Sequence, residues 1–142
     1  MTNTAANNEI VLFHAGQGLV LQVAQWIRRH SRHSLRLVSA KTPIAIEMAL
    51  SSAAVVIVDA TVDGDLALDV LEIANERLGR QHVGVYTEKL RDDLEIQVRL
   101  RGSLLLAGPM SPMEWEGFFE PLVGADVAKE DAKESLSSAE SN

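Results

Sequence analysis

The sequence predicts an α/β protein with one doubly wound sheet of five parallel strands, a (βα)5 arrangement. Five short apolar runs, rich in valine, leucine and isoleucine, alternate along the chain with longer segments in which apolar residues have helical spacing. The runs are almost continuous, whereas a strand with one exposed face would alternate apolar and polar residues. Such runs alternating with helical segments predict a parallel sheet covered by helices on both faces.

The predicted strands and helices alternate from residue 10 to residue 123. The strands are expected at 10–13, 35–38, 54–58, 83–86 and 104–107. The helices are expected at 18–31, 42–52, 65–78, 91–101 and 111–123. Each strand is an apolar run, and each helix carries an apolar stripe that can pack on the sheet.

Signals for the starts and ends of helices support these boundaries. Thr42 and Ser111 each precede a proline, which is the pattern of an N-cap followed by proline at the first helical position. Gly79, Gly102 and Gly124 follow the third, fourth and fifth helices, and glycine commonly ends a helix.

The chain is expected to form one domain. Its 142 residues are enough to bury a core without disulfides or a structural metal. We expect residues 1–8 to form a flexible N-terminus, residues 9–124 to form the domain, and residues 125–142 to form a disordered tail. The tail contains five acidic residues and two lysines and has almost no large apolar residues.

Composition and charge argue against several classes of function. A net charge of −7 argues against nucleic-acid binding, because proteins that bind nucleic acids usually carry a basic excess. The absence of cysteine excludes disulfides, thiol nucleophiles and thiolate metal sites. No apolar run approaches the roughly 18 residues of a membrane span, and the N-terminus lacks the basic region of a signal peptide. We therefore expect a cytoplasmic protein without nucleic-acid or membrane partners.

Four residues follow the predicted strands, at the edge where parallel α/β sheets bind their ligands. These are His14 after the first strand, Asp59 after the third, Thr87 after the fourth and Gly108 after the fifth. The segments VVIVDAT, VGVYTE and RGSLLLAGPMSPMEW surround three of them. In these segments the chain resembles the receiver domain of two-component response regulators, which implies a flavodoxin-like, CheY-like topology over roughly residues 9–123.

The resemblance implies a role for each position. In receivers an aspartate after the third strand accepts a phosphoryl group, and a serine or threonine after the fourth contacts that group. An acidic pair after the first strand holds Mg²⁺, and a lysine follows the fifth. Asp59 and Thr87 match the first two roles, but His14 and Ala15 replace the acidic pair and Gly108 replaces the lysine. The resemblance therefore implies a vestigial phospho-acceptor pocket.

Physical chemistry argues against phosphoryl transfer by this set of residues. A carboxylate that attacks a phosphoryl donor needs a cation to offset the charges of both groups, and Mg²⁺ usually supplies it. Mg²⁺ prefers several oxygen ligands in octahedral geometry, which Asp59 and a histidine provide poorly. We therefore expect a stand-alone pseudo-receiver, not an enzyme and without metal or cofactor, that acts as a regulatory or scaffolding module in bacterial signalling.

Other interpretations of these residues stay open. Asp59 caps the loop DATVDGD in a purely structural interpretation, or it is the phospho-acceptor of a phosphorylatable single-domain response regulator. The loop FHAGQG loosely resembles the loop of mannose-class sugar phosphocarriers, which makes His14 a candidate phosphocarrier. A small-ligand sensor with its site at the strand ends is a further alternative.

The last predicted helix indicates an interaction surface. It carries Trp115, Phe118 and Phe119, and one stripe of these rings should face the sheet while the adjacent ring stays outside. In receivers the fourth helix, fifth strand and fifth helix dock a partner or a second copy. Arg99 and Arg101 at the end of the fourth helix carry charges suited to such a face. We expect a protein partner or a homodimer through the fourth and fifth helices. For the rings themselves we expect core packing, and anchoring a partner on this surface is their alternative role.

One basic cluster, RRHSRHSLR, occupies residues 28–36. Cations at the end of a helix interact favourably with its dipole, and a docking patch is the alternative role. His30 and His33 have too few candidate ligands near them to predict a metal site.

Overall fold

The computed structural model describes residues 8–30 and 32–124. Five parallel strands form one sheet in the order β2-β1-β3-β4-β5. The strands are β1 (Glu9–Phe13), β2 (Ser34–Val38), β3 (Ala53–Asp59), β4 (Val83–Thr87) and β5 (Leu104–Ala107). The helices are α2 (Gln17–His30), α3 (Pro43–Ala49), α4 (Gly64–Leu78), α5 (Asp92–Leu100) and α6 (Pro112–Phe119). A 3-10 turn, η1 (Arg80–His82), precedes β4, and a π-helical turn, η2 (Glu120–Gly124), follows α6.

This arrangement confirms the predicted fold class. All five predicted strands and all five predicted helices are present between residues 9 and 124. The predicted flexible N-terminus, except for residue 8, and the predicted acidic tail lie outside the described residues.

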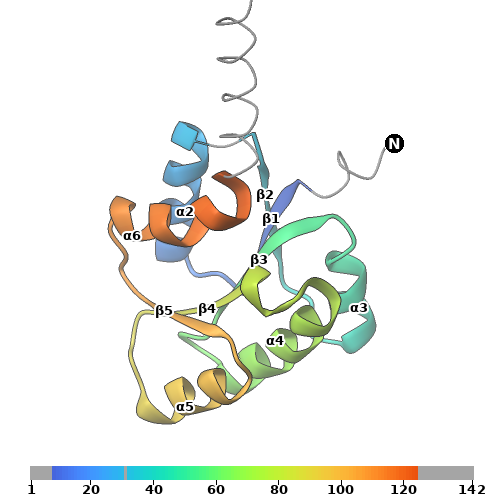
Figure 1. The fold of residues 1–142 in the computed structure, drawn as a ribbon. Helices are drawn as coiled ribbons and strands as arrows, with labels where there is room; N and C mark the ends of the chain where they lie inside the picture. The colour runs from blue at the N-terminus through green and yellow to red at the C-terminus, as the bar shows by residue number, and fades with distance from the viewer. Residues whose placement is uncertain (1–7, 31, 125–142) are drawn as a thin grey trace, which may run out of the picture.

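Helices cover both faces of the sheet, with α2 and α6 on one face and α3, α4 and α5 on the other (Figure 1). Alternate residues of a strand belong to the two layers. In β1, Val11 and Phe13 pack in the core beneath α3, α4 and α5, whereas Ile10 and Leu12 pack in the core beneath α2 and α6. Both faces are therefore buried, which explains why the central strands are continuous apolar runs.

The helix starts follow the predicted capping residues. The Thr42 hydroxyl accepts a hydrogen bond from the backbone N–H of Ala45, and Ser111 and Glu114 form a reciprocal capping box. Gly79 and Gly102 have φ angles of 97° and 71°, in the region that favours glycine, at the ends of α4 and α5. No helix in the described part of the chain is long and apolar enough to cross a membrane.

One difference from the predicted boundaries is at α3, which was expected over 42–52 and ends at Ala49. The backbone N–H of Leu50 bonds to the carbonyls of Glu47 and Met48, which tightens the last turn. The chain then turns so that β3 can begin at Ala53, which pairs with Glu9 of β1. The pairing of β3 with β1 therefore sets the end of this helix.

Candidate functional site at the carboxyl ends of the strands

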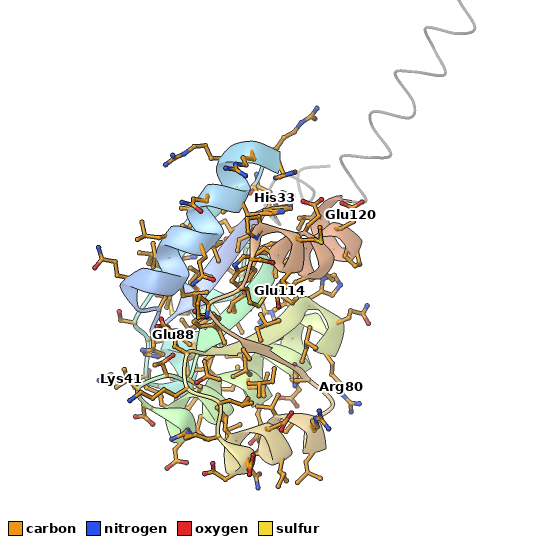
Figure 2. The ribbon with its side chains drawn as sticks, turned by 90° about the vertical axis from the view of Figure 1, so that its left-hand side faces the viewer. His33, Lys41, Arg80, Glu88, Glu114 and Glu120 are labelled. Carbon is orange, nitrogen blue, oxygen red and sulfur yellow. The ribbon has the colours of Figure 1, made fainter. Side chains whose placement is uncertain are left out.

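The fold brings the four predicted site residues to one edge of the sheet. Asp59 ends β3 and Thr87 ends β4, while His14 and Gly108 directly follow β1 and β5. These strands are consecutive neighbours in the order β1-β3-β4-β5 and run parallel. Figure 2 shows Lys41 and Glu88, on the loops after β2 and β4, on this side of the molecule, and Arg80 on the opposite side.

The Asp59 carboxylate is buried and held by two backbone donors. One oxygen, Oδ2, accepts a hydrogen bond of 2.9 Å from the N–H of Gly16, and Oδ1 accepts one of 2.9 Å from the N–H of Thr61. The residue is only 6% exposed. The side chain therefore joins the loop after β1 to the loop after β3, which agrees with the structural interpretation of Asp59 as a loop cap.

The Thr87 hydroxyl is bonded within its own loop. It donates to the carbonyl of Lys89 at 2.9 Å and accepts from the N–H of Lys89 at 3.2 Å. Next to it, the N–H of Glu88 donates to the Thr61 hydroxyl oxygen at 3.1 Å, which ties the β4 loop to the β3 loop. The two best-matching receiver positions, Asp59 and Thr87, thus share an edge, but each forms its hydrogen bonds with loop backbone.

His14 has an unusual backbone and lies toward β2. Its φ angle is 56°, which is uncommon for a residue other than glycine. Its Nε2 lies 2.9 Å from the carbonyl oxygen of Ala40, in the loop after β2, and its backbone N–H donates to Val38. The imidazole therefore links the first two loops, and the structure records no hydrogen bond from it to Asp59.

Gly108 packs directly against Tyr86, the residue before Thr87. A Cβ atom at position 108 would collide with the ring and hydroxyl of Tyr86. The ring is fully buried, and its hydroxyl accepts a hydrogen bond of 2.9 Å from the side-chain amide of Gln22. Burial raises the pKa of the Tyr86 hydroxyl, while the hydrogen bond from Gln22 acts in the opposite direction. A lysine at position 108 would therefore require Tyr86 to move.

Gln22 is the centre of a hydrogen-bond network that was not predicted from the sequence. Its amide nitrogen donates to the Gly18 carbonyl at 3.0 Å and to the Tyr86 hydroxyl at 2.9 Å. Its amide oxygen accepts from the Met110 N–H at 2.9 Å and from Trp115 Nε1 at 3.0 Å. All four bonding positions of the amide are used, so one side chain joins α2, β4 and the start of α6.

A signal for Gln22 was present in the sequence. The residue lies three positions after Leu19 and four before Trp26, both of which are buried. Gln22 therefore borders the apolar stripe of its helix, where a polar side chain needs partners.

The residues at this edge do not fit the Mg²⁺ site of the receiver domains that the sequence resembles. Among the described residues no group of three or more histidine, aspartate or glutamate side chains is arranged to hold a metal ion. Both oxygens of Asp59 already accept backbone hydrogen bonds, and His14 is directed to a carbonyl. Mg²⁺ favours several oxygen ligands, so this donor set is poor.

The aromatic residues predicted for the interaction surface lie in the core. Trp115, Phe118 and Phe119 are 2%, 8% and 0% exposed, so the expectation that one ring stays outside is wrong. Gly84 of β4 makes room for Phe118, because a Cβ atom on it would lie 3.2 Å from that ring. Burial leaves these rings unable to anchor a partner on the surface, and the packing role applies.

The two arginines predicted for the same surface form ion pairs. Arg99 pairs with Glu95 on its own helix at 3.0 Å and remains highly exposed. Arg101 pairs with Glu72 of α4, also at 3.0 Å, and so holds the end of α5 against α4. The surface does contain exposed apolar side chains, namely Ile96, Leu100, Leu104 and Met113.

No family model matches the sequence, and the search of curated proteins found no match. Solved structures do match. The chemotaxis protein CheY4 of Vibrio cholerae has a TM-score of 0.61 at 9% identity, covering 81% of this chain and 98% of its own. The receiver domain of a two-component response regulator from Bacteroides fragilis has a TM-score of 0.58 at 17% identity, with coverages of 78% and 91%.

A pilus assembly protein has the same fold as these receiver domains. The pilus assembly protein CpaE from Caulobacter crescentus has a TM-score of 0.59 at 18% identity, covering 82% of this chain and 94% of its own. At these identities the comparisons establish the fold. The chain therefore has the flavodoxin-like, CheY-like fold of receiver domains.

Proposed function

We propose that this chain is a pseudo-receiver: a cytoplasmic regulatory or scaffolding module of bacterial signalling that acts through protein contacts and accepts no phosphoryl group at Asp59. The receiver fold supports a role in two-component signalling. In this proposal the chain is not an enzyme and uses no cofactor.

The environment of Asp59 carries the proposal. The carboxylate is buried, both of its oxygens accept backbone hydrogen bonds, and no lysine or arginine forms an ion pair with it in the described part of the chain. Attack on a phosphoryl donor would bring a second anionic group to this position. Without a cation, the transition-state charge has no counter-charge.

The packing of Tyr86 on Gly108 supports the same conclusion. In receivers the residue that follows the fifth strand is a lysine, and here the corresponding space is filled by the Tyr86 side chain. The Gln22 network fixes Tyr86 in this position. The cation is therefore replaced by packed aromatic and amide groups that stabilise the native structure.

Partner binding is proposed at the surface formed by α5, β5 and α6. Ile96 and Leu100 lie one helical turn apart on α5 and are 55% and 73% exposed, and Leu104 at the start of β5 is 52% exposed. Exposed apolar side chains near exposed charges such as Arg99 suit a homodimer or a protein partner. CpaE is named as a pilus assembly protein, which makes a component of such an assembly one candidate partner.

Phosphoryl incorporation tests the proposal. The full chain is incubated with acetyl phosphate and MgCl₂ and its intact mass is recorded, with a phosphorylatable receiver as the positive control and Asp59→Asn as the matched variant. The proposal predicts no added phosphoryl group. An added group that Asp59→Asn abolishes would identify a working response regulator, and an acid-labile group that His14→Ala abolishes would identify a phosphocarrier.

A further inference from the structure

A narrow groove lies between α2 and the start of α6. These two helices are adjacent on one face of the sheet (Figure 1). Trp26 and Trp115 line it together with Met110 and Pro112, and Gln25 and Arg29 lie at its α2 side. The groove is on the α2 side of α6, and the surface assigned above to a partner or a second copy is formed with α5 and β5.

The size of the groove limits what it can hold. Its cavity volume is about 40 Å³. Sites for whole small molecules usually have volumes of about 300–1,000 Å³, whereas one water needs roughly 10–15 Å³ measured in this way. The groove is therefore too small for a metabolite and large enough for the end of one aliphatic side chain.

The charges beside the groove favour an anionic partner. Arg28 and Arg29 are both exposed, and neither forms a hydrogen bond or an ion pair within the described residues. His30, the next residue, pairs with Glu116 at 3.2 Å. Of the two unpaired arginines only Arg29 lines the groove. In a chain of net charge −7, an unpaired cation beside an apolar groove is complementary to a carboxylate.

The walls of the groove are held in place before any partner binds. The indole N–H of Trp115 donates to Gln22 at 3.0 Å, and that of Trp26 donates to Glu116 at 3.2 Å. Both rings also stack on Phe119, with centroid distances of 5.5 and 4.4 Å. Pro112 follows the Ser111 cap, which fixes the first turn of α6. A preformed groove avoids the free-energy cost of ordering its walls on binding.

We propose that this groove docks a segment of a partner protein that inserts one aliphatic side chain between α2 and α6 and pairs a neighbouring carboxylate with Arg29. The aliphatic group follows from the volume, and the carboxylate follows from the unpaired cation. The inference goes beyond the proposed function, because it does not depend on whether Asp59 accepts a phosphoryl group.

The two tryptophans of the chain both line the groove, so intrinsic fluorescence reports directly on its occupancy. The probe is the blocked peptide Glu-Glu-Leu-Glu-Glu, titrated into the full chain to millimolar concentration. Glu-Glu-Ala-Glu-Glu and Lys-Lys-Leu-Lys-Lys are the control peptides. We expect a saturable fluorescence change with the leucine peptide. The alanine peptide should bind about tenfold more weakly, because it loses most of the buried apolar surface.

Matched variants locate the carboxylate contact. Arg29→Ala should weaken binding of the leucine peptide about tenfold, which is the size expected for a charge-assisted contact. Arg28→Ala removes the same charge one residue away and should change the binding of this peptide less than about twofold. Equal binding of the leucine and alanine peptides, equal effects of the two variants, or no saturable binding would overturn the proposal. Two results with the peptide-free Arg29→Ala variant would also overturn the proposal. A change of oligomeric state would assign the groove to a second copy, and a change in the NMR signals of residues 125–142 would assign it to the chain's own C-terminal segment.

Discussion

Replacing Gln22 by alanine should destabilise the protein strongly, although the residue is a polar side chain on a helix. The change removes the acceptor of two donors, the Met110 N–H and Trp115 Nε1, and the donor to the Tyr86 hydroxyl. A donor left without a partner costs about 1–3 kcal/mol, and the low end applies because the site is only half-buried. Two orphaned donors at about 1 kcal/mol each, plus about 0.8 kcal/mol for lost side-chain packing, give about 3 kcal/mol.

Urea unfolding followed by far-UV circular dichroism measures this loss, because the tryptophan signals themselves depend on Gln22. Gln22→Met keeps the apolar packing and should cost about 2 kcal/mol, which isolates the hydrogen bonds. Gln25→Ala is the control on the same helix: Gln25 is exposed and should change the free energy of unfolding by less than about 0.5 kcal/mol. A Gln22→Ala variant as stable as Gln25→Ala would refute the role of the network.

Three further predictions concern Asp59, Tyr86 and the α5 surface. Asp59→Ala orphans the N–H groups of Gly16 and Thr61 and should lower the free energy of unfolding by about 2 kcal/mol in urea, whereas equal stability would show that the carboxylate is no loop cap. The folded-state pKa of Tyr86 is raised above its usual value of 10.0, so the stability from this group is fully present below about pH 10 and is lost as the pH rises through the folded-state pKa. Urea titrations from pH 8 to 11 should therefore show a loss of stability that Tyr86→Phe removes. An identical pH dependence in the variant would contradict this. Leu100→Glu should reduce self-association or partner binding at the α5 surface at least about tenfold, measured by analytical ultracentrifugation or by a pull-down with an identified partner. Leu21→Glu, which changes another exposed leucine, on α2, should not reduce it. Equal effects of the two variants would place the contact elsewhere.

The fold was predictable because its strongest signals are local. Runs such as Ala54–Val58 are apolar throughout since β3 is covered on both faces, and capping residues such as Ser111 mark helix starts without tertiary information. The end of α3 was not predictable in the same way. It depends on where Ala53 pairs with Glu9, which is 44 residues earlier in the chain, and no local residue encodes that register.

The sequence predicted which residues lie at the candidate site, but it could not predict which groups they contact. The order of strands determines that His14, Asp59, Thr87 and Gly108 reach one edge. The directions of their side chains depend on the loops, so the sequence could not show that His14 reaches Ala40 or that Thr87 bonds to Lys89. The burial of Phe118 depends on Gly84 in a different strand. Contacts of this kind are set by packing between distant segments.

The central claim is that the Asp59 pocket does not bind a phosphoryl group, and NMR with a phosphoryl analogue tests it most directly. The amides of Gly16 and Thr61 donate to the Asp59 carboxylate, so their ¹H–¹⁵N signals report on any group that engages it. Beryllofluoride with Mg²⁺ is titrated into the full chain. We predict unchanged signals for Gly16, Thr61 and Thr87. Saturable shifts of these signals that disappear in Asp59→Asn would contradict it.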